Sequence, residues 1–330
     1  MRIDKSEGLF GEITMSRSTF PDLFASSPCF LGEGAVIERL RRNPALELNP
    51  YLVNAAFIYK AAPRAALEAI CRQYLEIGRD SGLPLLLSTP TWRASRERIA
   101  AAGYEGIDVN GDNVRFLAAL RHSYGDYATQ VSVCGLMSCR GNAYCPGEAL
   151  DVDAAQLYHA WQAGQLAEAG VDVLLAATLP AISEATGLAL ALAATAKPYL
   201  LSFVVRPEGT LLDGTPLKEA IAAIDAAVTP RPLAYLINCT HASFAKAALT
   251  HADNSSPLVR QRIVGLLANT AALSPEELDG SSSLVEEDPA TFGATVAALH
   301  QEMGLKILGG CCGTDDRHIR ALATRLVTVA

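Results

Sequence analysis

The chain has 330 residues, of which half are hydrophobic and 19% are charged, and its formal net charge is −8. This acidic balance argues against a nucleic-acid or anionic-membrane partner, because either would require a basic stripe on the surface. No apolar run reaches the roughly 18 residues of a membrane span, and the first residues lack the apolar core of a signal peptide. We therefore expect a cytoplasmic protein whose eight cysteines are thiols or metal ligands rather than disulfides.

Eight short apolar runs, mostly of Leu, Ile and Val, recur along the chain and alternate with stretches of helical character. Their length and composition are typical of strands that are buried on both faces of a parallel sheet. The runs are residues 29–36, 83–91, 129–136, 171–180, 198–205, 232–240, 262–270 and 305–314.

Four of the intervening segments carry clear helix signals. Residues 151–170 open on aspartates and close on Gly170, and residues 216–227 open on Pro216. Residues 315–327 open on acids and place apolar side chains at helical spacing. Residues 183–196 are apolar all round, so this helix is expected to pack on the sheet or on a partner.

Eight strands that alternate with helices predict an α/β fold, a single (β/α)₈ TIM barrel over residues 29–330. Residues 1–28 precede the first strand as an N-terminal extension. A doubly wound open sheet is the competing arrangement, but no Gly-x-Gly-x-x-Gly follows the first strand to favour it. The most loop-like stretch, residues 274–290, follows the seventh strand. In such a barrel the active site lies at the carboxyl-terminal ends of the strands.

Three cysteines fall at these strand ends. Cys239 closes the sixth run, and the adjacent Cys311 and Cys312 close the eighth. Only one strand separates the sixth from the eighth around a closed barrel, so the three side chains can converge. The adjacent pair alone has three interpretations, namely a vicinal disulfide, a structural pair or a metal site. The disulfide would be strained, because neighbouring Cα atoms are about 3.8 Å apart whereas disulfides prefer about 4.4–6.8 Å.

The third cysteine favours the metal site. Three protein ligands without an obvious fourth are typical of a catalytic zinc whose open position takes the substrate. An all-sulfur shell selects zinc over magnesium or calcium and suits a thiol substrate. A free alkyl thiol is only about 3% ionised at pH 7, and zinc would remove its proton. The expected chemistry is attack by the substrate sulfur on an activated alkyl group, so no protein side chain is assigned as a catalytic group.

The segment GGCCGT followed by HIRAL, together with NC at an earlier strand end, resembles the zinc-dependent homocysteine S-methyltransferases. The match is close over residues 307–322 and can be followed with lower fidelity from about residue 30 to the end. The resemblance implies a homocysteine-binding-type TIM barrel with Cys239, Cys311 and Cys312 as the Zn²⁺ ligands. It implies methyl transfer from a sulfonium or ammonium donor to a thiol, homocysteine, giving methionine. A separate corrinoid protein is an alternative donor.

The resemblance extends to the pocket. GEGAVIERL resembles the first-strand Asp-Gly-Gly motif, with Glu33 in place of the Asp and Gly34 after it. Trp92, in STPTWRAS, stands where the family usually has Tyr, and Asn269 in LLANT resembles the family's Asn. Asn238, directly before Cys239, is expected to hydrogen-bond a sulfur or the substrate, or to support the backbone. Glu33, Gly34, Trp92, Asn238 and Asn269 are therefore the predicted substrate-binding residues.

One departure concerns the acceptor. In the family the fourth strand ends in a Glu that holds the amino group of homocysteine, and here LLAATLP places Ala177 at that position. Losing this charge-assisted contact removes about 1.5–3 kcal/mol of binding free energy. Either the longer Glu33 compensates, or the acceptor is a different thiol. A third alternative is a non-catalytic zinc- or thiol-binding protein.

The remaining polar residues near strand ends have ordinary interpretations. We expect Cys134, Cys139 and Cys145 to be simple thiols or pocket lining rather than a second metal site. His241 is expected to point away from the site, and His318 to lie on a helix surface. Trp92 and Tyr104 are candidates for an aromatic wall around a cationic donor, with one of them in the core. Residues 286–290 are expected to form a solvated acidic loop. Because the sequence ends after the last barrel helix, we expect a monomer or a small dimer.

Overall fold

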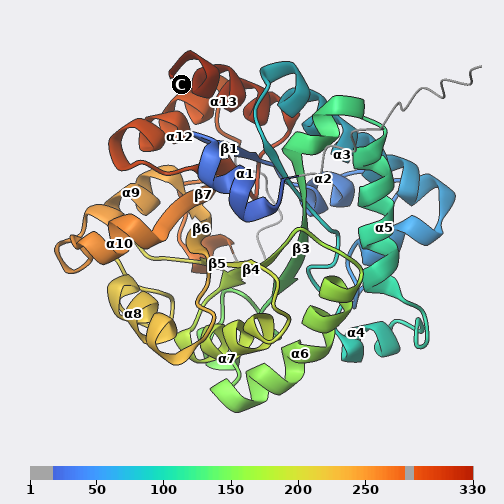
Figure 1. Cartoon of the computed structure of the whole chain (residues 1–330), viewed down its shortest axis with the longest axis horizontal. Helices are drawn as coiled ribbons and strands as arrows, with labels where there is room; N and C mark the ends of the chain where they lie inside the picture. The colour runs from blue at the N-terminus through green and yellow to red at the C-terminus, as the bar shows by residue number, and fades with distance from the viewer. Residues whose placement is uncertain (1–17, 279–285, 330) are drawn as a thin grey trace, which may run out of the picture.

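The computed structural model describes residues 18–278 and 286–329. Its eight strands are parallel and form a closed barrel in which each strand pairs with the next and β8 pairs with β1 (Figure 1). This closure confirms the TIM barrel and excludes the open doubly wound sheet. The strands are β1 (Phe30–Gly32), β2 (Leu85–Ser88), β3 (Val131–Ser138), β4 (Val173–Leu179), β5 (Tyr199–Phe203), β6 (Ala234–His241), β7 (Ile263–Asn269) and β8 (Ile307–Gly310). Each lies within, or overlaps, one of the eight predicted runs.

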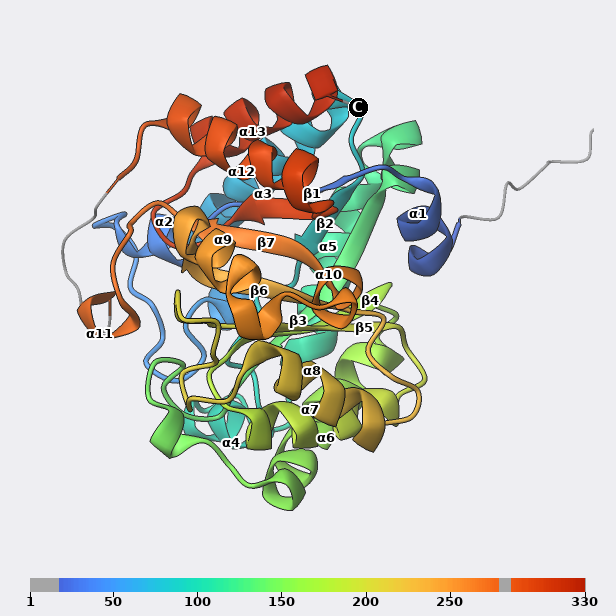
Figure 2. The same ribbon diagram turned by 90° about the vertical axis from the view of Figure 1, so that its left-hand side faces the viewer.

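The helices form a ring around the strands, as the two ribbon views show (Figures 1 and 2). The four predicted helices correspond to α6, α7, α8 and α13. The apolar α7 packs along α6 and against β4 and β5, which accounts for its composition. The helices are α1 (Phe20–Ser26), α2 (Ile37–Arg41), α3 (Ala61–Ser81), α4 (Arg96–Ala101), α5 (Val109–His122), α6 (Val152–Glu168), α7 (Ile182–Ala193), α8 (Leu217–Ala227), α9 (Ala242–Thr250), α10 (Pro257–Arg262), α11 (Pro275–Leu278), α12 (Pro289–Met303) and α13 (Asp316–Val329).

Helix α1 lies at the amino-terminal end of the barrel, away from α2 and α11 at the other end (Figure 2). Phe20 and Leu23 are buried there against side chains that enter the barrel from the first residues of the strands, such as Phe30 and Ile307. The Nζ of Lys306 donates to the carbonyl of Phe24 near the end of the helix. The described part of the predicted N-terminal extension therefore covers the amino-terminal end of the barrel.

Close backbone contact between β1 and β8 closes the barrel. A Cβ on Gly309 would lie 2.7 Å from the Cα of Gly32, so neither position accommodates a side chain without separating the two strands. This proximity also sets the cysteine segment after β8 beside the segment after β1. Gly32 and Gly309 thus bring the segment after β1 next to the cysteine segment after β8.

The structure corrects one prediction about a histidine. His318 was expected on a helix surface, but its side chain is fully buried. Its Nδ1 lies 2.9 Å from the Asp315 carboxylate and its Nε2 lies 2.9 Å from the Glu287 carbonyl. The ring also packs edge-on against Phe292. The prediction was wrong because the segment before α12 folds over the first turn of α13 and covers the face that would otherwise meet solvent.

The predicted acidic loop is only partly exposed. Glu286 pairs with Arg317, while Glu287 is half-buried and lies 3.8 Å from the His241 ring. Asp288 caps α12 by accepting from the Thr291 N–H. Residues 279–285 of the longer loop-like stretch, 274–290, lie outside the described residues. Within the described ranges, no helix is long and apolar enough to cross a membrane.

Candidate metal centre and pocket

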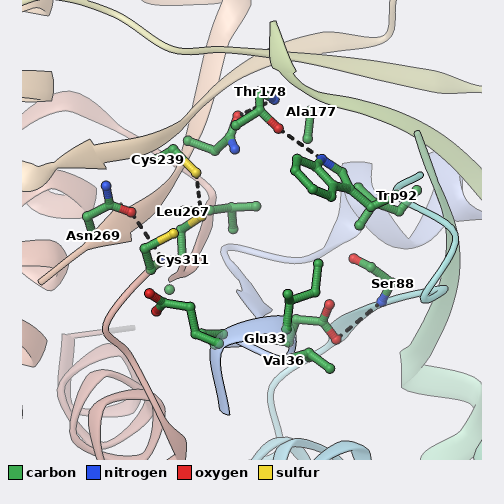
Figure 3. Close-up of a pocket in the computed structure, with 18 of the residues that line it drawn as sticks. Glu33, Val36, Ser88, Trp92, Ala177, Thr178, Cys239, Leu267, Asn269 and Cys311 are labelled. Carbon is green, nitrogen blue, oxygen red and sulfur yellow. Dashed lines mark hydrogen bonds between the residues drawn. The ribbon is translucent and has the colours of Figure 1, made fainter. Parts of the chain in front are cut away.

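A cavity of about 700 Å³ opens at the carboxyl-terminal ends of the strands. It is lined by the last residues of β4 and β6 and by the segments that follow β1, β2, β3, β7 and β8, which is where the fold is expected to place a site (Figure 3). All five predicted substrate-binding residues line this cavity, and so do Ala177 and the three predicted zinc ligands.

The structure brings Cys239, Cys311 and Cys312 together. Their sulfur atoms lie within 4.8 Å of one another, and Cys239 Sγ is 2.8 Å from Cys311 Sγ. All eight cysteines of the chain are free, so neither the vicinal disulfide nor any other bridge is present. The convergence expected from strands six and eight is therefore observed in the geometry.

Cys239 reaches the cluster through an irregular strand end. Its φ of 52° lies in the left-handed region, which non-glycine residues rarely adopt, and the register between β6 and β7 shifts at this point. Thr178, at the end of β4, has a similar φ of 59° beside a second register shift. Such outliers are held in place by their surroundings and cluster at functional sites.

Hydrogen bonds from their backbone N–H groups hold the adjacent pair in place. The Cys311 N–H donates to the Ala268 carbonyl at 2.7 Å, and the Cys312 N–H donates to Asn269 Oδ1 at 3.1 Å. Gly313 follows with a φ of 86°, where a side chain would be strained. These bonds leave both thiol groups free to face Cys239.

Thr314 joins the cysteine turn to the segment after β1. Its buried hydroxyl accepts a hydrogen bond from the Ala35 N–H at 3.0 Å and donates one to the Cys311 carbonyl at 2.7 Å. One side chain therefore sets the distance between the cysteine pair and the wall that carries Glu33.

The three thiols share their protons unequally. Hydrogen bonds from Cys239 and Cys312 lower the pKa of Cys311 well below its usual range, and the same contact raises the pKa of Cys239. Sulfur atoms bound at about 2.3 Å to one tetrahedral zinc are about 3.8 Å apart. The cluster needs an opening of only about 1 Å between Cys239 and Cys311 to reach that spacing, so the residues fit the metal.

Two carboxylates line the same pocket. Glu33 accepts from the Ser88 N–H at 3.3 Å, and burial raises its pKa from 4.5 to about 8. Glu38, on α2, accepts from the Gly313 N–H and pairs with Arg42 at 3.2 Å, in both cases through Oε2. Burial, and then the neighbouring Cys312, raise the pKa of Glu38. No hydrogen bond from the described residues to its Oε1 is seen.

The aromatic residues of the pocket differ from the expected pair. Trp92 lines the cavity and donates from Nε1 to Thr178 Oγ1 at 3.1 Å. Tyr104 does not line the cavity, since it stacks on Tyr59 in a separate cluster. The second aromatic side chain is Tyr144, which packs against the three cysteines and whose pKa is raised by Cys239 and by burial.

The two predicted asparagines mainly support the backbone. Asn238 Oδ1 accepts from the Thr178 N–H at 2.9 Å and from Ser202 Oγ at 2.7 Å, which joins β4, β5 and β6. Asn269 holds the cysteine turn through Oδ1, and its buried Nδ2 has no partner among the described residues. Both side chains touch the pocket.

Other candidates lie apart from this site. Cys134, Cys139 and Cys145 do not line the cavity, and they form no group of three possible metal ligands within the described ranges. His241 caps α9 by accepting from the Ser243 N–H and likewise lies outside the cavity.

Sequence reasoning missed Glu38, Tyr144 and Arg93. Glu38 lies on α2, just past the GEG motif, and Tyr144 lies in the long stretch after β3. The charge of Arg93, next to Trp92, is the only signal that could have pointed to it. None of the three positions has a periodic pattern.

A closed α/β barrel with three converging thiols at its carboxyl-terminal mouth defines a TIM-barrel protein with a thiol-rich candidate metal site. The family described as homocysteine S-methyltransferase matches residues 30–326, and the chain belongs to this family.

Two curated relatives share this family name. The chain is 32% identical to homocysteine S-methyltransferase of Escherichia coli (strain K12) over 191 residues, which cover 56% of each protein. It is 26% identical to homocysteine S-methyltransferase YbgG of Bacillus subtilis (strain 168), over 59% of this chain and 60% of that protein. The chain thus spans little more than half the length of these two relatives.

The metallated form of the homocysteine methyltransferase MmuM from Escherichia coli has a similar fold. Its TM-score is 0.71 at 24% identity, and the superposition covers 92% of this chain and 98% of that one. At this identity the likeness supports the fold.

Proposed function

We propose that the protein transfers a methyl group from a sulfonium or ammonium donor to a thiol acceptor, homocysteine, giving methionine. The observation that carries this proposal is the convergence of three free thiols from two strand ends on one point of an enclosed pocket. The proposed catalytic unit is the barrel of residues 29–330, with residues 1–28 as an extension before it. Such a packed set of free thiols stays reduced in a compartment like the cytoplasm.

Cys239, Cys311 and Cys312 would hold the Zn²⁺. When bound, the metal would remove the proton of the acceptor thiol and keep its sulfur nucleophilic. The sulfur then forms a bond to the donor methyl while the bond from that methyl to the donor sulfur or nitrogen breaks. The donor leaves as a neutral sulfide or tertiary amine, so its departure needs no acid. The thiol proton passes to solvent.

The chain's own residues orient the acceptor. The backbone bonds to Cys311 and Cys312 fix the turn, and Thr314 sets its distance from the wall that carries the carboxylates. Glu38 would be the partner for the acceptor's ammonium group, because its carboxylate accepts from the N–H of Gly313, the residue after Cys312. This contact offsets the carboxylate that is lost at Ala177.

A different thiol acceptor is the second candidate, and Ala177 favours it. This residue lines the cavity without a polar group where the family resemblance implies a Glu. A panel of thiols would separate the two candidates. Turnover with a thiol that lacks the amino group, at a kcat/KM equal to or above that of homocysteine, would favour the second.

The test of the proposal is zinc-edge X-ray absorption on the reduced protein before and after homocysteine is added. We expect three sulfur ligands that rise to four. A Cys239→Ala variant should lose zinc and methyl transfer together, whereas Cys145→Ala should keep both, since Cys145 lies outside the cluster. Full zinc content in Cys239→Ala would contradict the three-ligand assignment.

A further inference from the structure

Arg93 is a charged residue of the pocket wall without a carboxylate partner among the described residues. It lines the cavity in the turn between β2 and α4. Its Nη1 donates to the Cys139 carbonyl at 2.7 Å and to the Arg140 carbonyl at 3.0 Å. The described contacts leave its Nε and Nη2 without an acceptor. A planar guanidinium that is fixed along one edge offers the other edge for bidentate binding of a carboxylate.

Trp92 fixes the plane of this guanidinium. The Arg93 Cζ lies 4.2 Å from the centre of the Trp92 ring, and Trp92 is itself held by its hydrogen bond to Thr178 at the end of β4. The nearby Glu184 carboxylate is engaged elsewhere, by the Arg140 N–H, the Leu150 N–H and His159. The charge of Arg93 is therefore preorganised and directly unpaired at the cavity wall.

Arg93 lies across the barrel mouth from Cys239. In the closed order of eight strands, β2 is four strands away from β6, which carries Cys239, and two strands away from β8, which precedes Cys311 and Cys312. Figure 3 shows Cys239 and Cys311 on one side of the pocket and Trp92 on the other. An acceptor held by its sulfur at the cysteines receives the methyl group in line, so the rest of the donor extends away from the cysteines, toward β2.

We propose that Arg93 binds a carboxylate of the methyl donor and so makes the protein selective for sulfonium or ammonium donors that carry one. This inference rests on the proposed methyl transfer and adds the residue that selects the donor. Removing the carboxylate from the donor, or the guanidinium from the protein, deletes the same contact. The losses of binding free energy from the two changes should therefore not be additive.

The experiment measures equilibrium binding by calorimetry, independently of turnover, with S-methylmethionine and with its carboxamide. Betaine and its carboxamide form a second pair of ligands, and homocysteine is measured as well. The variants are Arg93→Met, Arg93→Lys and the matched control Arg98→Met. Arg98 also donates to the Arg140 carbonyl, but it does not line the main cavity.

We expect Arg93→Met to weaken binding of at least one carboxylate donor by about 10- to 100-fold, the usual value of a hydrogen bond to a charged group. Its carboxamide and homocysteine should bind unchanged. Arg93→Lys should retain part of the affinity, and Arg98→Met should behave as the wild type.

Three outcomes would overturn the proposal, and a fourth would separate it from the proposed function. If Arg93→Met bound the carboxylate donor and its carboxamide more weakly by the same factor, Arg93 would only support the loop after β3. Weaker binding of homocysteine to Arg93→Met, with donor binding unchanged, would mean that Arg93 binds the acceptor and not the donor. If neither carboxylate donor bound to the wild type, Arg93 would not be a binding site for the donor carboxylate. Tight donor binding that depends on Arg93, without any methyl transfer, would support the role of Arg93 and refute the proposed function.

Discussion

Replacing Thr314 by Val should loosen the cysteine turn without changing the shape of the core. The Thr314 hydroxyl makes two buried hydrogen bonds, from the Ala35 N–H and to the Cys311 carbonyl. The Cys311 carbonyl keeps a second donor in the Thr314 N–H at 3.2 Å, so only the Ala35 N–H is left without a partner. An unsatisfied buried donor lowers the free energy of unfolding by about 1–3 kcal/mol. Because this bond orients the turn, metal affinity should fall about 10-fold.

Thr91→Val is the matched control for this substitution. Thr91 is equally buried and hydrogen-bonded, to Thr89 and to the Leu136 carbonyl, but it does not line the cavity. Urea unfolding of the metal-free variants should show a loss of stability in both, while competition for zinc with a chromophoric chelator should show weaker binding in Thr314→Val alone. Equal zinc affinities in the two variants would refute the argument that Thr314 positions the cysteines.

Two further predictions concern the carboxylates. Because the pKa of Glu33 is raised to about 8, the folded metal-free protein holds that proton more tightly than the unfolded chain, so its free energy of unfolding should fall between pH 5 and pH 8 by at most about 1.4 kcal/mol per pH unit. Glu33→Gln should flatten this slope in urea unfolding, and an unchanged slope would contradict the burial argument. Glu38→Gln should raise the KM for homocysteine about 10-fold or more while leaving a thiol without an amino group unaffected. Equal changes in both KM values would assign Glu38 to the structure of the turn.

The barrel and its cysteine cluster could be predicted from the sequence because each depends on local pattern and order. Apolar runs of strand length identify the strands, and the rule that parallel strands end at one edge brings Cys239 to Cys311. Arg93, Tyr144 and Glu38 could not be placed in the same way. Two lie in loops and one on a five-residue helix, and the direction of such side chains depends on contacts with distant segments.

The two histidines show the same limit of local pattern. His241 was expected outside the site and lies outside the cavity, where it caps α9. Regular alternation would place it on the same face as Cys239, two residues earlier, but the backbone at Cys239 is irregular. His318 was misplaced because a segment that comes earlier in the chain, at Glu287, covers it. Local spacing reports which face of a helix is apolar, but it does not report which loop folds over that face.

The pairing of β8 with β1 has a consequence for the order in which the molecule matures. Residues 307–312 complete the ring of strands and also supply two of the three thiols. During synthesis, Cys239 leaves the ribosome about 70 residues before its partners, and in that interval it stands alone beside an unclosed sheet. A single thiolate holds zinc weakly. At the proposed zinc site, the last strand would complete the ring of strands and the set of ligands together, and a nascent chain that stops before it would have neither.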